Sequence, residues 1–244
     1  MTPEKQTELQ SRFDLPFRKL DYLANIDEER RIVYFETPKV ACTSIKKYMI
    51  DKASHESIEL APSEVHNRQK SPLRMLSSYS DDAVDLILSA QDGYRLFCFV
   101  RDPYSRVLSA YLDKIITNEW ERKRHLPIFG FEQGARPKFV DFLHRLSRIS
   151  DCDRDIHYIT QARLTGRLGG LMMGFVGRFE DFKSDFLRLK SEFYDDASTE
   201  DYQSFGKHHS SDAVNKLAAY YGDEERKIVR DIYSVDFAVY GYPL

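Results

Sequence analysis

Two short apolar segments, each followed by a helical pattern, constrain the fold of this 244-residue chain more than any other feature. Residues 31–36 and 95–100 are rich in β-branched and aromatic side chains, as expected of strands buried on both faces of a sheet. Apolar residues at helical spacing follow at 44–51 and again after Pro103. Strands that alternate with helices predict an α/β fold with a parallel sheet.

The second helix has a clear start in the sequence. Asp102 suits the N-cap, and Pro103 suits the first helical position, where its missing N–H is not needed. The preceding strand is therefore expected to end near Arg101. By the same patterns we expect a further strand at 172–178 and helices at 181–193, 212–221 and 223–233.

Length and composition favour one large domain. Hydrophobic residues make up 42% and charged residues 31% of the chain, which is typical of a globular protein. We expect an N-terminal extension over residues 1–30 and a single domain over 31–244. The net charge of −3 provides no general attraction for nucleic acid, so no nucleic-acid partner is predicted.

Cysteine usage and hydropathy indicate the cellular setting. The three cysteines form no C-x-x-C pair, which argues against a disulfide framework and a zinc site and favours the reducing cytoplasm. The first 30 residues are highly charged and contain no apolar signal region. The longest apolar run, 96–100, is far shorter than the roughly 20 residues of a membrane span. We therefore expect neither a signal peptide nor a membrane anchor.

Residues 37–46 join the first strand to its helix and have the properties of an anion site. Lys39, Thr43 and Ser44 lie around the helix N-terminus, where free N–H groups and the helix dipole favour negative charge. An ordinary capped helix beside a solvated lysine is the alternative interpretation. The segment lacks the G-x-x-x-x-G-K-[ST] pattern, so phosphate binding is plausible while ATP hydrolysis is not favoured.

Residues 99–114 place Arg101 at the carboxyl end of the second strand and Ser109 two turns into the next helix. Ligands of open α/β sheets bind outside the carboxyl ends of the strands, and a guanidinium group suits phosphate oxygens. Arg106 is expected to pair with a carboxylate. Taken singly, each of these residues is as well explained by a purely structural role.

Together the two segments resemble the carbohydrate sulfotransferases, particularly the Golgi chondroitin and HNK-1-type family. Residues 38–47 read P-K-V-A-C-T-S-I-K-K, and residues 99–111 read F-V-R-D-P-Y-S-R-V-L-S-A-Y. These are similar to the family's 5′-phosphosulfate and 3′-phosphate motifs, in the same order and at compatible spacing. The resemblance continues through 64–66, 175–180, 231–237 and 240–242.

The chain also departs from the family pattern. Ser44-Ile45 replaces Asn-Trp, Asp102 replaces Glu, and Arg178 stands where Lys is common. The resemblance implies a P-loop-like three-layer fold with a central, mainly parallel sheet flanked by helices. It also implies the donor 3′-phosphoadenosine 5′-phosphosulfate, with adenosine 3′,5′-bisphosphate as the product.

The resemblance assigns roles to individual residues. The 5′-phosphosulfate would be held by Lys39, Val40, Ala41, Cys42, Thr43 and Ser44. The 3′-phosphate would be held by Arg101 and Ser109. Lys39 is the candidate for stabilising the leaving group, and His66 is the candidate base because it matches a Glu-Val-His position of the family. Glu64 is the rival base. No metal is expected in this chemistry.

The acceptor is implied to be a glycan, with a smaller hydroxyl compound as the alternative. Residues 118–137 contain two prolines and two glycines and are expected to form a long surface loop. Side chains of this loop are candidates for gripping an anionic sugar, namely Trp120, Arg122, Lys123, Arg124 and His125.

Two other functions use similar elements. A nucleotide or small-molecule kinase shares the strand-loop-helix anion site, but it requires Mg²⁺ held by a hydroxyl and a nearby Asp. A non-catalytic relative would bind the nucleotide without transferring a group. The oligomeric state has no signature in the sequence.

Overall fold

A computed structural model describes residues 1–54, 60–61, 64–198 and 213–244. By their internal contacts, the residues form two compact units. The first unit comprises residues 1–100 and 163–208, and the second comprises 101–162 and 209–244. The short helix α8 (Gln161–Leu164) contains one of the points at which the chain passes from one unit to the other.

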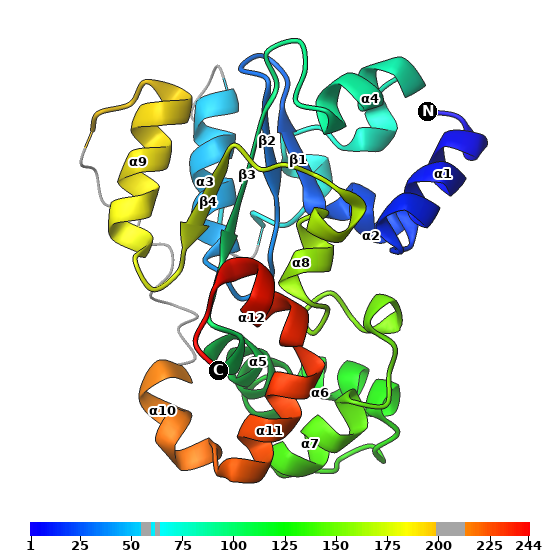
Figure 1. Ribbon diagram of the computed structural model, residues 1–244, viewed down its shortest axis with the longest axis vertical. Coiled ribbons are helices and arrows are strands. Elements are labelled where there is room, and N and C mark those ends of the chain that lie inside the picture. The colour runs from blue at the N-terminus through cyan, green and yellow to red at the C-terminus, as the bar shows by residue number, and fades with distance from the viewer. Residues whose placement is uncertain (55–59, 62–63, 199–212) are drawn as a thin grey trace. The chain divides into compact units, whose positions relative to one another are not determined.

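The first unit is built on a four-stranded sheet with the strand order β1-β2-β3-β4 (Figure 1). The strands are β1 (Ala24–Asp27), β2 (Ile32–Phe35), β3 (Arg95–Val100) and β4 (Phe175–Arg178). β1 pairs with β2 in antiparallel orientation, whereas β2–β3 and β3–β4 are parallel. The predicted α/β fold with a mainly parallel sheet is confirmed.

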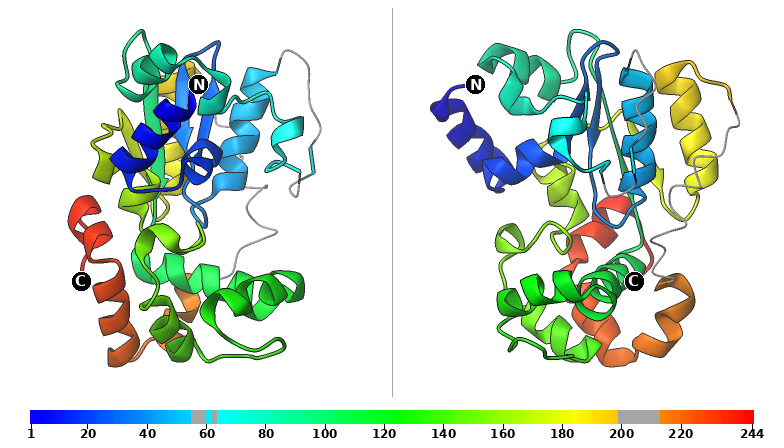
Figure 2. Two further views of the ribbon diagram at one scale, coloured as in Figure 1. Left: turned by 90° about the vertical axis from the view of Figure 1, so that its right-hand side faces the viewer. Right: turned by 180° about the vertical axis from the view of Figure 1, so that it is seen from behind.

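Helices cover both faces of this sheet. On one side lie α3 (Cys42–Ala53) and α9 (Phe182–Tyr194), and on the other lie α1 (Pro3–Phe13), α2 (Phe17–Leu23) and α4 (Asp81–Leu88), as Figures 1 and 2 show. The unit therefore has three layers. Short 3₁₀ helices complete it at Arg68–Lys70, Leu76–Ser78 and Arg167–Gly169.

The sheet's composition follows from its burial between two helix layers. All residues of β2 and all but Arg95 of β3 are buried, which explains the continuous apolar runs in the sequence. Tyr34 and Phe97 are register partners, and their rings stack at 5.0 Å between centroids. Phe186 of α9 packs edge-on against Tyr48 of α3 at 5.3 Å, so both helices share one aromatic core with the sheet.

The sequence located most elements of this unit to within a few residues. The strand predicted at 95–100 is β3, and the strands predicted at 31–36 and 172–178 are the shorter β2 and β4. The predicted helices at 44–51 and 181–193 are α3 and α9. The domain limits stay a prediction, and β1, which lies before residue 31, is part of the sheet.

The second unit is helical. Its α-helices are α5 (Pro103–Tyr111), α6 (Glu119–His125), α7 (Phe139–Leu146), α10 (Ala213–Tyr220), α11 (Asp223–Ile232) and α12 (Ser234–Tyr240). The Asp102 side chain accepts the Ser105 main-chain N–H at 2.8 Å, which confirms the predicted N-cap of α5. The closing helices predicted at 212–221 and 223–233 are α10 and α11, and α12 was not expected.

The prediction of a long loop over 118–137 is wrong for its first half. A π-helical turn over Leu112–Thr117 leads into α6, and a 3₁₀ helix follows at Leu126–Phe129. Asn118 caps α6 by accepting the Glu121 N–H at 3.1 Å. Pro127 lies in the first turn of the 3₁₀ helix, where proline is tolerated, so it does not break helical structure there.

Within the described ranges, every helix is too short or too polar to cross a membrane.

Candidate functional site

The connection between β2 and α3 has the backbone geometry of an anion-binding turn. Lys39 and Ala41 have positive φ angles of 70° and 52°, whereas Val40 between them does not. Alternation of this kind turns successive N–H groups toward a common point and forms a concave nest for anions. Ala41 is the N-cap of α3 and supplies no side-chain cap. The first amides of α3 are thus left for a ligand or solvent.

The residues predicted to bind the 5′ end of the donor all lie on this turn or in the first turn of α3. Val40 and Ser44 are buried, and Lys39, Ala41, Cys42 and Thr43 are partly exposed. Val40 and Ile45 belong to the core cluster, and this packing fixes the turn against the sheet. The absence of acidic residues from the first turn of α3 keeps the helix N-terminus attractive to anions.

A buried charged cluster lies directly beside this turn. Lys46 Nζ is 3.1 Å from Glu36 Oε2, and His66 Nδ1 is 3.4 Å from Glu36 Oε1. His66 Nε2 is 3.1 Å from Thr43 Oγ1. The structure therefore brings the candidate base into contact with a residue of the predicted donor loop.

Core packing positions His66. The side chain belongs to a turn over residues 64–66, in which Val65 is fully buried and packs in the same core as Val40 and Ile45. The imidazole of His66 itself keeps 31% of its surface exposed. An external hydroxyl can therefore approach the ring.

The surroundings of His66 favour its protonated form. Burial alone would lower the pKa of His66, but hydrogen bonding to Cys42 and Glu36 outweighs this effect and raises the pKa to about 9. The free protein thus carries an imidazolium at neutral pH. The assignment of His66 as base stays a prediction.

Glu36 was missed at the sequence level. Burial alone would raise the pKa of its carboxyl group, but the charges of Lys46 and His66 hold that pKa well below the usual range. The sequence did contain a signal for it, because Glu36 is a charged residue at the carboxyl end of an otherwise apolar strand. By contrast, the rival base Glu64 is paired with Lys70 and accepts the Ala61 N–H at 3.1 Å.

Glu36, Cys42 and His66 bring three potential metal ligands within 4.8 Å of one another. The Lys46 ammonium group contacts Glu36 and lies 3.4 Å from His66 Nδ1. A fixed positive charge at this point opposes a second cation. The cluster therefore suits an anionic ligand better than a metal ion.

The second predicted motif lies in the helical unit. Arg101 Nε donates to Ser105 Oγ at 3.0 Å, and both side chains are buried. Ser105 and Ser109 are one helical turn apart on α5 and so share a face of the helix. Arg101, Ser105 and Ser109 therefore follow one another along this face. Ser105 was not expected as a site residue, although its spacing from Ser109 was visible in the sequence.

A network of hydrogen bonds holds Arg101 in place. The Gln161 side chain accepts the Arg101 N–H and donates to the Arg101 carbonyl, each at 2.8 Å. Asp236 in turn accepts the main-chain N–H groups of Gln161 and Ala162 at 2.8 Å. Burial raises the pKa of Asp236 to about 6. Arg106 donates to the carbonyls of Ile159 and Ile156, and its charge also acts on the Asp236 carboxylate.

The side chains proposed to grip an acceptor divide into two groups. Arg122 and His125 are buried, and Arg122 donates to the Ile116 carbonyl at 3.0 Å, so the prediction that these two face an acceptor is wrong. Trp120 is 70% exposed, and the Arg124 guanidinium lies 5.5 Å from its ring centroid. Lys123 is exposed and pairs with Glu119.

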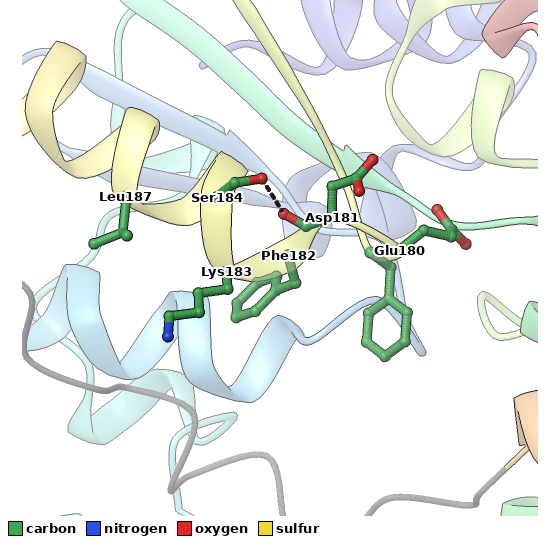
Figure 3. A pocket seen from close by; sticks show the side chains of 7 residues that line it. Glu180, Asp181, Phe182, Lys183, Ser184 and Leu187 are labelled. Carbon is green, nitrogen blue, oxygen red and sulfur yellow. Dashed lines mark hydrogen bonds between the residues drawn. The ribbon is translucent and has the colours of Figure 1, made fainter.

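An open pocket of about 540 Å³ lies at the start of α9, in the first unit (Figure 3). Its lining residues are Phe179, Glu180, Asp181, Phe182, Lys183, Ser184 and Leu187. The Ser184 hydroxyl donates to the Asp181 carbonyl at 3.0 Å within this lining (Figure 3). None of the residues predicted for the donor or for catalysis lines it.

Comparison with known proteins supports the family resemblance that the two motifs indicated. Over residues 23–243 the chain matches the model of the sulfotransferase family. It is 30% identical to carbohydrate sulfotransferase 10 of Homo sapiens over 65% of this chain and 49% of that protein. No solved structure matches.

Two further relatives extend the similarity along the chain. Carbohydrate sulfotransferase 9 of Homo sapiens is 25% identical over 89% of this chain and 52% of its own length. Carbohydrate sulfotransferase 12 of Xenopus laevis is 27% identical over 94% of this chain and 62% of its own length. The chain thus spans about half to three fifths of the relatives it matches. Because the family match covers nearly the whole chain, this protein belongs to the sulfotransferase family.

Proposed function

We propose that this protein transfers a sulfuryl group from 3′-phosphoadenosine 5′-phosphosulfate to a hydroxyl group of a carbohydrate. The observation that carries this proposal is the nest at Lys39–Ala41, together with the contact between Thr43 and His66. It combines an anion site with a titratable group that an acceptor can reach. Family membership and the names of the relatives support sulfuryl transfer to carbohydrate.

Each of the two motifs, taken by itself, suits a phosphate group. In the first unit, Lys39, Thr43, Ser44 and the amides of residues 40–45 would hold the 5′-phosphosulfate. In the second unit, Arg101 and Ser109 would hold the 3′-phosphate, since a guanidinium fork matches phosphate oxygens. The bond between Arg101 and Ser105 orients that fork before the ligand arrives.

The transfer makes one bond and breaks one. The acceptor oxygen bonds to sulfur while the bond from sulfur to the bridging phosphate oxygen breaks, and the acceptor hydroxyl loses its proton. Lys39 would stabilise the charge that develops on the bridging oxygen. His66 would take the proton at Nε2 while its Nδ1–H donates to Glu36.

The protonated state of His66 gives this mechanism a distinct pH dependence. With a pKa of about 9, His66 acts as a base only in the fraction of molecules that have lost the proton. The imidazolium in turn adds positive charge beside the donor loop. Donor binding is therefore favoured on the acid side of this pKa, and proton transfer is favoured on the alkaline side.

Trp120 offers an exposed aromatic face on which a sugar ring can stack, and Arg124 beside it suits an anionic substituent. We propose this pair as part of the acceptor site. We also propose that the protein works in a reducing compartment such as the cytoplasm. The support for this is that Cys42, Cys98 and Cys152 are free thiols.

Calorimetric titration with adenosine 3′,5′-bisphosphate and with ATP–Mg²⁺ tests the donor class. We expect binding of the bisphosphate and at least about tenfold weaker binding of ATP–Mg²⁺, because the chain lacks the glycine-rich triphosphate loop. The reverse preference would indicate a kinase. Normal bisphosphate affinity without sulfuryl transfer to any member of a glycan panel would indicate a binding protein.

A further inference from the structure

The helical unit contains a second cluster of titratable side chains, which the proposed transfer does not use. His125 is the last residue of α6, and Asp155 and His157 follow the 3₁₀ helix at Asp151–Asp153. One nitrogen or oxygen of each side chain lies within 4.8 Å of the other two. His125 Nε2 is 3.7 Å from Asp155 Oδ1, and His157 Nδ1 is 2.5 Å from the same oxygen.

A hydrogen bond from its other ring nitrogen orients His125, as is usual for histidines that bind metal ions. Its side chain is 0% exposed, and its Nδ1 lies 2.9 Å from the Glu121 carbonyl oxygen, which can only accept. Nδ1 therefore carries a hydrogen, and Nε2 is the ring nitrogen that faces the Asp155 carboxylate. Nε2 is buried and lies 3.7 Å from Asp155 Oδ1, beyond ordinary hydrogen-bond distance. Buried polar groups are normally hydrogen-bonded, so this orientation requires an explanation.

Solvent can reach the cluster past its other two side chains. Asp155 and His157 each keep 18% of their surface exposed, so the fully buried His125 is reached past them. The Asp155 carboxylate also accepts the His157 main-chain N–H at 3.1 Å, which holds both side chains in one tight turn. Two imidazoles and one carboxylate that converge at an accessible point form the ligand set of an open zinc site.

We propose that His125 Nε2, Asp155 Oδ1 and His157 Nδ1 bind a divalent transition-metal ion of the zinc class, with water as the remaining ligand. Ligands at about 2.0–2.2 Å from a tetrahedral ion lie about 3.4 Å from one another. His157 must move away from Asp155 by somewhat less than one ångström, and His125 must move slightly closer. A metal ion requires the lone pair of His157 Nδ1, so the ring would bind as the neutral tautomer that carries its hydrogen on Nε2.

Such an ion would connect α6 to the segment that supports α5. The carbonyl of Ile156, between two of the ligands, accepts from Arg106 at 3.4 Å, and Ile159 accepts from the same guanidinium at 2.8 Å. Arg106 belongs to α5, which also carries Ser105 and Ser109. The ion would thus link two segments of the helical unit, and the proposal does not depend on the proposed sulfuryl transfer.

Metal binding by the full-length protein, stripped with a chelator, tests this proposal. We expect one Zn²⁺ per chain in competition with a chromophoric zinc indicator, and a tetrahedral spectrum with Co²⁺. Asp155→Asn and His157→Gln should each weaken Zn²⁺ binding by at least about a hundredfold. Because His125 is fully buried, these two variants carry the test, and circular dichroism verifies their folding.

Matched variants identify the site. His144→Gln removes a half-exposed histidine of the same unit, Cys42→Ser removes a ligand of the other cluster, and His208→Gln with His209→Gln removes a pair outside the described residues. All three should bind Zn²⁺ as the parent protein does. Absence of Zn²⁺ binding by the parent, or unchanged binding by Asp155→Asn and His157→Gln, would overturn the proposal. Loss of binding in one of the matched variants alone would overturn it as well.

Discussion

Glu36 and Lys46 form a buried ion pair beside the turn between β2 and α3, with Lys46 Nζ 3.1 Å from Glu36 Oε2 and side-chain exposures of 3% and 0%. A buried pair is weak support for stability, because removing two charges from water is expensive. The carboxylate also faces His66, whose pKa it helps to raise. We infer that the main role of this ion pair is electrostatic, because it influences the charge of the neighbouring His66.

Removal of one member of this pair should be strongly destabilising. Glu36→Gln leaves the Lys46 ammonium buried without its counter-ion, so we expect a loss of about 3–5 kcal/mol in the free energy of unfolding, measured by urea denaturation. Lys46→Met in the same chain should restore part of it. The control is Glu64→Gln, which removes an exposed partner of Lys70 and should leave the urea midpoint nearly unchanged.

The pKa of His66 predicts how stability varies with pH. Because this pKa rises from about 6.5 in the unfolded chain to about 9, the contribution is fully present below pH 6.5 and is lost as the pH rises through 9. We expect the free energy of unfolding to fall by up to about 3 kcal/mol across this window. His66→Asn should remove most of this slope. An equally steep slope in the variant would assign it to other groups.

The same residue governs the proposed chemistry. His66→Asn should lower kcat by at least about a hundredfold, while affinity for adenosine 3′,5′-bisphosphate changes much less. In the parent protein kcat/KM should increase with pH up to about 9, since the free protein must lose the His66 proton before it can accept another. His144→Asn is the control, with unchanged kcat. A parent profile that is flat between pH 6 and 9 would count against His66 as the base.

Lys39 is expected to act mainly in the transition state. Lys39→Ala should lower kcat by at least about a hundredfold, because the ammonium group would no longer offset the charge on the leaving oxygen. Steady-state kinetics with saturating donor measures this effect. Lys52→Ala, at the other end of α3, removes a lysine paired with Asp196 and should leave kcat unchanged. Equal rates for Lys39→Ala and the parent would exclude Lys39 from the mechanism.

Arg101 is expected to act on donor binding. Arg101→Ala should weaken adenosine 3′,5′-bisphosphate by about 10–100-fold in calorimetric titration, the usual range for a charge-assisted hydrogen bond. Adenosine 5′-monophosphate lacks the 3′-phosphate, so its affinity should stay the same. An equal loss for both ligands would mean that the substitution disturbs the fold instead. Arg188→Ala, an exposed arginine on α9, provides the control.

Local patterns in the sequence determined the strands, most of the helices and the anion-binding turn. Apolar runs such as 95–100 and caps such as Asp102 depend on neighbours a few residues away, so they can be read without the fold. The same locality explains the error at 118–129. The prolines and glycines of this segment predict a loop, whereas a cap at Asn118 and tertiary packing produce short helices.

Only the tertiary structure decided which side chains work together. Thr43 and His66 are 23 residues apart, and Gln161 and Asp236 are 75 apart, yet each pair is in contact. No local sequence pattern reveals a contact between residues so far apart along the chain. The pKa of His66 likewise depends on Glu36, which the sheet places beside it. The sequence thus determined the turn between β2 and α3 and the family motifs, whereas folding determined the charges around that turn, because charge depends on burial and on neighbours brought from elsewhere in the chain.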